Sequence, residues 1–182
     1  FDISGSMCVS EALAGKHKFK GDNMTAISKE LLKFSDGSSQ FYDNNHSHVT
    51  WVSRMQCLKA GIESYIEQMS KASPKNKVGI VTFSNEVFCY GDGSTKDMSR
   101  VEGNSLYDEN KIIDIAEKSQ FLVKKEVGDT YQSLIKHLYT IEESGQTALG
   151  PAIMFSIHLL KNAAQGSKII LCTDGLANMG LG

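Results

Sequence analysis

The sequence predicts an α/β protein with a mostly parallel sheet, because short β-branched runs alternate with helical stretches in the second half of the chain. Two continuous apolar runs, 77–84 and 168–173, have the length and composition of strands that are buried on both faces. A further run, 85–90, follows the first after only a tight turn, so it can pair only in the antiparallel sense. The expected sheet is therefore mostly parallel, with one antiparallel strand near an edge.

Four stretches carry apolar residues at helical spacing. From 51 to 71 these residues recur at steps of three and four, and Pro74 follows the end of the pattern. Shorter stripes cover 110–116 and 131–141, and the stretch 151–164 begins with a proline, which the first turn of a helix tolerates. Residues 9–50 fit neither pattern. We expect them to be an insertion, mainly a long loop at 35–47 with a short helix at 24–34.

The composition is that of one globular domain. The chain has 182 residues, of which 41% are hydrophobic and 22% charged, with a formal net charge of −2. This charge provides no broad cationic field for nucleic acid or anionic lipid. The chain contains no run of roughly 18 apolar residues, so no membrane span is expected. The four cysteines lack CxxC metal spacing and are expected to be reduced thiols.

Oxygen-bearing side chains occur in three separate segments. Asp2, Ser4 and Ser6 form a DxSxS pattern where an apolar strand would end, Thr147 precedes the proline-started helix, and Asp174 follows the run 168–173. Each residue alone fits an ordinary role in a cap or a turn. In an open parallel sheet, however, the loops at the carboxyl ends of neighbouring strands face one crevice. The joint occurrence therefore favours one shared site.

With these residues in place, the chain resembles the von Willebrand factor A family, whose metal-ion-dependent adhesion site uses a DxSxS loop, a threonine on a second loop and an aspartate on a third. The resemblance assigns Mg²⁺ or Mn²⁺ as the cofactor, with Asp2, Ser4, Ser6, Thr147 and Asp174 as the metal site. It also implies a doubly wound, Rossmann-like sheet with helices on both faces. Relative to that fold, 1–182 is expected to be a partial domain that lacks the start of the first strand and the C-terminal elements.

Two carboxylates and three hydroxyls would leave a bound cation with much of its positive charge. We therefore expect a non-enzymatic module that binds a glutamate or aspartate of a partner protein through the metal. The alternative is a structural scaffold domain of a larger intracellular complex in which the metal is incidental. Unpaired cysteines and the lack of a leader favour an intracellular protein. Coat-protein trunk domains and copine-like proteins share the fold, but no motif selects either, and the oligomeric state is not indicated.

Enzymatic alternatives fit less well. A phosphohydrolase with Asp2 as nucleophile would need a second acid two residues later, where the chain has Ser4. No G-x-S-x-G elbow surrounds Ser4 or Ser6, as many serine hydrolases would require, and no GxxxxGK[ST] loop is present. His46 and His48 form a pair with metal-binding chemistry, but two histidines in a loop are more often solvated. We therefore expect no catalytic activity.

Overall fold

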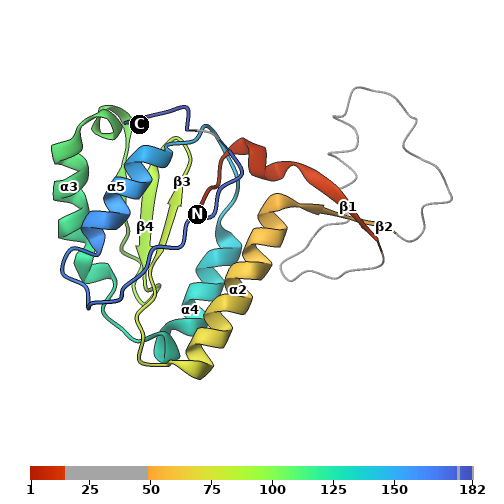
Figure 1. Ribbon diagram of the computed structural model, residues 1–182, viewed down its shortest axis with the longest axis horizontal. Coiled ribbons are helices and arrows are strands. Elements are labelled where there is room, and N and C mark those ends of the chain that lie inside the picture. The colour runs from red at the N-terminus through yellow and green to blue at the C-terminus, as the bar shows by residue number, and fades with distance from the viewer. Residues whose placement is uncertain (15–48, 176, 182) are drawn as a thin grey trace.

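The computed structural model describes residues 1–14, 49–175 and 177–181 (Figure 1). The strands are β1 (Ser10–Ala14), β2 (Val49–Ser53), β3 (Ile80–Phe83), β4 (Val87–Gly91) and β5 (Ser99–Val101). The helices are α2 (Arg54–Ala72), α3 (Glu109–Lys118), α4 (Val127–Thr140) and α5 (Leu149–Leu159). Short 3-10 turns, η1 (Gly5–Cys8), η3 (Gly103–Tyr107) and η4 (Ser119–Leu122), complete the order.

The expectation of a doubly wound, mostly parallel sheet is wrong. The described strands pair antiparallel, as a three-stranded sheet in the order β3-β4-β5 and a separate two-stranded ribbon of β1 and β2. Within the described residues, parallel pairing is limited to a single bridge between Asp2 and Phe83. The hairpin of β3 and β4 was predicted correctly, but β4 is the central strand of the sheet, and the edge strand β5 was not anticipated.

The run 168–173 explains much of this error. It forms no strand, although the backbone N–H of Asp2 donates to the carbonyl of Cys172 (2.9 Å). Its apolar side chains, Ile169, Ile170 and Leu171, are 44%, 56% and 45% exposed, whereas the prediction required them to be buried. Apolar composition indicates that a segment favours burial, but it does not supply the hydrogen-bonded neighbours that make a strand.

The four helical predictions are confirmed, with shifted ends. The start of α2 at Arg54 is fixed by a capping box, in which the backbone N–H of Gln56 donates to Ser53 Oγ (3.1 Å) and that of Ser53 donates to Gln56 Oε1 (2.8 Å). The residues before it belong to β2. Further along the chain, α5 ends at Leu159, and the backbone N–H of Leu160 donates to the carbonyls of Ser156 and Ile157.

Helices flank the sheet on both sides (Figure 1). α3 and α5 pack together over one side, where Phe83, Cys89, Ile112 and Phe155 are buried in one core cluster. α2 and α4 pack over the other side, and their apolar faces enclose a second cluster that includes Ile3. Burial of these two faces provides the main driving force for folding. No described helix is long and apolar enough to cross a membrane.

Only the two ends of the predicted insertion 9–50 are among the described residues. These ends, 10–14 and 49–50, lie in the β1–β2 ribbon, which continues to Ser53 and extends from the body of the domain (Figure 1). The expected helix at 24–34, the loop at 35–47 and the histidines of 46–48 lie outside the described residues.

Candidate functional site

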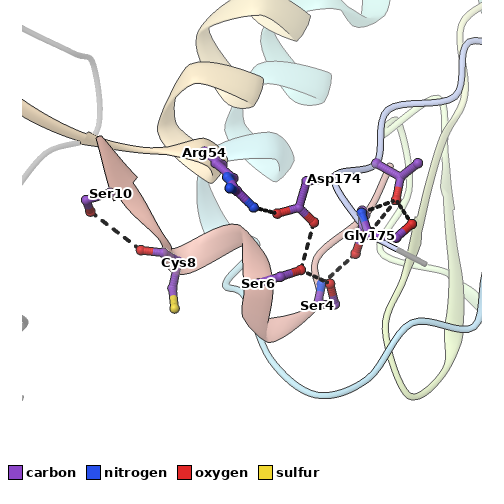
Figure 2. Close-up of polar contacts among 9 residues, drawn as sticks. Ser4, Ser6, Cys8, Ser10, Arg54, Asp174 and Gly175 are labelled. Atoms are coloured by element: carbon purple, nitrogen blue, oxygen red, sulfur yellow. Dashed lines mark hydrogen bonds and ion pairs between the residues drawn. The ribbon is translucent and has the colours of Figure 1, made fainter. Parts of the chain in front are cut away.

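The first and third predicted loops meet in space (Figure 2). We call Asp2, Ser4, Ser6, Thr147 and Asp174 the oxygen cluster. Ser4 Oγ lies 3.0 Å from Ser6 Oγ, and Ser6 Oγ donates to Asp174 Oδ1 at 2.7 Å. Hydrogen bonds therefore join two serines at the start of the chain to an acid near its end.

Asp2 is the buried member of the cluster and joins two of its loops. Its side chain is fully buried, and both carboxylate oxygens accept hydrogen bonds. The backbone N–H of Ser4 donates to Oδ1 (2.8 Å), and the hydroxyl of Thr173 donates to Oδ2 (2.6 Å). Asp2 thus connects the first loop to the third. The bond from Thr173 also gives a role to the residue before Asp174, which the sequence analysis did not single out.

Thr147 enters the same region from the second loop. Its backbone N–H donates to Asn178 Oδ1 (2.7 Å), and its carbonyl accepts from the backbone N–H of Asn178 (3.1 Å), so the residue is held on both sides. A methyl group added at Gly175 would lie 3.7 Å from Ser6 Oγ and 3.8 Å from Thr147 Oγ1. Both hydroxyls therefore border the space over Gly175, and this proximity is the observation that associates Thr147 with the cluster.

Main-chain bonds fix the second loop against the first. The N–H of Gly5 donates to the carbonyl of Gly145 (2.9 Å), and the N–H of Ser144 donates to the carbonyl of Ile3 (2.7 Å). Gly145 has a φ of 79°, a conformation that glycine adopts without strain, and a Cβ there would lie 2.6 Å from the Asn85 side chain. These contacts fix the position of the second loop relative to the DxSxS segment.

Sequence reasoning missed Arg54. Its Nη1 lies 2.5 Å from Asp174 Oδ2, so the carboxylate is shared between Arg54 and Ser6 (Figure 2). Burial would raise the pKa of Asp174, but the hydrogen bonds from Ser6 and Arg54 and the charge of the guanidinium outweigh burial and lower it. The S-x-x-Q pattern at 53–56 was the available signal, since it marks a helix start and puts Arg54 in the first turn.

A cavity of about 360 Å³ adjoins this ion pair. Its walls are largely apolar, with Arg54 and Asp174 among the lining residues, and the others are Met7, Val52, Cys57, Leu58, Cys172 and Thr173. The polar cluster is therefore bordered on one side by a hollow that has room for a side chain.

The donor set suits a hard cation. Mg²⁺ takes octahedral oxygen ligands at about 2.0–2.1 Å, so neighbouring ligand oxygens are about 2.9 Å apart. The separations from Ser6 Oγ, 3.0 Å to Ser4 and 2.7 Å to Asp174, match that spacing. Among the residues that the structure describes, no group of three or more His, Cys, Asp and Glu side chains forms a metal centre. Any cation here would therefore depend mainly on hydroxyls, and the hydrogen bonds that join Ser4, Ser6 and Asp174 form without one.

Comparisons with known proteins identify the domain. Residues 47–182 match the Sec23/Sec24 trunk domain, a match that includes Arg54, Thr147 and Asp174 but not the DxSxS loop. The chain is also 30% identical over 134 residues to a protein named circularly permutated Ras protein 1 from Dictyostelium discoideum. That match covers 73% of this chain but only 16% of the relative. No solved structure matches. Because the trunk-domain match covers most of the sequence, the chain belongs to the Sec23/Sec24 trunk domain family, which has a von Willebrand factor A-like fold.

Proposed function

We propose that this chain is a protein-binding scaffold domain of a larger intracellular, coat-like assembly, and that the oxygen cluster is its docking point. Membership of the Sec23/Sec24 trunk family supports the scaffold role and the setting. The finer part of the proposal is that the cluster holds Mg²⁺ or Mn²⁺ and receives a glutamate or aspartate of the partner. The observation that carries this part is the position of Ser6 Oγ, at ligand–ligand spacing from both Ser4 and Asp174.

The residues of the cluster would divide the work. Ser4 and Ser6 present hydroxyl oxygens, Thr147 borders the same space, and buried Asp2 keeps the first and third loops together. Counting Arg54, the local charge is about −1, which is enough to attract a cation but not to neutralise it. A bound divalent ion would supply a positive coordination position for a carboxylate oxygen of the partner.

A second candidate is a scaffold that needs no cation. Its specific support is the ion pair between Arg54 and Asp174, which already gives the third-loop carboxylate a positive partner. In that case the cluster would be an architectural connection between loops, and partners would contact the surface around it.

Calorimetric titration of the full chain with Mg²⁺ and Mn²⁺ separates the two candidates. Asp2→Ala and Asp174→Ala should both abolish binding if the cluster holds the ion. Asp114→Ala is the matched control, because it removes the same charge from the exposed face of α3, where Asp114 pairs with Lys118. Absence of binding by the folded parent would reject the metal-dependent docking point and leave the cation-free scaffold.

A further inference from the structure

We propose that Arg54 competes with the divalent cation for Asp174 and so sets the affinity of the site. This inference rests on the proposed function and identifies how that same site is regulated. It starts from the fact that the third-loop carboxylate already has two partners, Ser6 on Oδ1 and Arg54 on Oδ2.

The position of Arg54 is dictated by the fold around it. The capping box of Ser53 and Gln56 makes it the first residue of α2, and its backbone N–H donates to the carbonyl of Val9 (3.0 Å). Val9 directly follows η1, the turn that carries Ser6. The same short connection therefore anchors both the arginine and one of the hydroxyls that would bind the ion.

The contact between the two side chains lies at the surface but is partly shielded from water. The Asp174 side chain is only 14% exposed, and that of Arg54 is 39% exposed. A cation that approaches Ser4 and Ser6 also meets the positive charge of Arg54 next to the acid that it would use. Full use of the Asp174 carboxylate requires the guanidinium to move away from Oδ2.

The adjoining cavity offers a place for that movement. Arg54 lines it together with Met7, Val52 and Leu58, whose apolar surface suits the methylene stem of an arginine. Its volume of about 360 Å³ leaves room for another side-chain rotamer. The site can thus change between a state in which Asp174 pairs with Arg54 and a state in which it faces the cation.

The competition is tested by Mn²⁺ titration of the full chain with neutral and charged replacements at this position. Separation of two opposite unit charges that are about 3 Å apart in a water-like dielectric corresponds to roughly a tenfold change in affinity. We therefore expect Arg54→Gln to bind Mn²⁺ about tenfold more tightly than the parent. Arg54→Lys, which keeps the charge, should stay close to the parent value.

The outcomes separate this inference from the proposed function. Binding by Arg54→Gln alone, lost again in the Arg54→Gln/Asp174→Ala double variant, would support the competition in its strongest form. Equal affinity in the parent and Arg54→Gln, with loss in Asp174→Ala, would overturn the competition but keep the metal site. No binding by any folded variant would overturn both. Thermal unfolding in a chelator, with and without Mn²⁺, gives a second readout, because bound ion raises the Tm of the variant that binds it.

Discussion

Asp2 is predicted to stabilise the domain even without a cation. The change to make is Asp2→Ala, measured by urea unfolding of the full chain in the presence of a chelator. The side chain is fully buried, and both of its oxygens accept hydrogen bonds, from the Ser4 N–H at 2.8 Å and the Thr173 hydroxyl at 2.6 Å.

The magnitude follows from those two bonds. A hydrogen bond to a charged group contributes about 1.5–3 kcal/mol, and a buried donor left without a partner costs about 1–3 kcal/mol. Ser4 is almost fully buried, so its N–H would pay that cost, whereas Thr173 is exposed and can turn to water. We expect Asp2→Ala to lower the free energy of unfolding by about 2–4 kcal/mol.

Asp2→Asn is the matched control, because the amide oxygen can still accept from Ser4 and the amide nitrogen can donate to the Thr173 hydroxyl. It should lose less stability than Asp2→Ala while removing the charge that a cation would need. An unfolding free energy of Asp2→Ala equal to that of the parent in chelator would refute the architectural role. Equal losses in both variants would show that the charge, and not the hydrogen bonding, carries the stability.

Three other predictions concern the surrounding structure. Gly145→Ala should lower stability by at least about 1 kcal/mol in urea unfolding, since its φ is positive and a Cβ would meet a neighbouring side chain, whereas Gly61→Ala, in open space on α2, should stabilise by about 0.5–1 kcal/mol; the reverse order would contradict the loop geometry. Burial raises the pKa of Asp92, but the hydrogen bonds that it accepts, among them three from backbone N–H groups, outweigh burial and lower it. The contribution of Asp92 to stability is therefore present above the unfolded pKa near 3.8 and is lost as pH falls through the folded value. Asp92→Asn lacks this titrating carboxylate, so its stability should fall less steeply below pH 4 than that of the parent. Its acid unfolding should begin at higher pH only if the variant is already less stable near neutral pH. Burial raises the pKa of Cys89 to about 11, so alkylation at pH 8 should modify exposed Cys57 and spare Cys89 until the chain unfolds; early modification of Cys89 would refute its burial.

Helices were easier to predict than strand pairing for a physical reason. A helix closes its hydrogen bonds within one segment, and its apolar stripe is visible in the local sequence, as at 51–71. A strand needs a neighbour that the local sequence does not specify. The runs 77–84 and 168–173 look alike, yet the first supplies β3, and the second remains exposed with no ladder.

The oxygen cluster was predictable in part. Order and residue type pointed to Ser4, Ser6 and Asp174, and the structure brings these three into one hydrogen-bonded chain. Arg54 was not predictable from that pattern, because its approach to Asp174 depends on β2 and the start of α2, which lie far from the DxSxS motif in sequence. Whether an ion occupies the cluster remains a prediction.

The β1–β2 ribbon also brings two distant parts of the sequence together at its outer end. Its outermost pair joins Ala14 to Val49, so these two residues lie side by side. For a flexible connection between fixed, adjacent ends, doubling the length costs only about 0.6 kcal/mol in closure entropy. This position can therefore accept segments of very different length and sequence while the register from Ser10 to Ser53 stays the same. The outer end of the ribbon, away from the oxygen cluster, is therefore a position at which sequence can differ without rebuilding the domain.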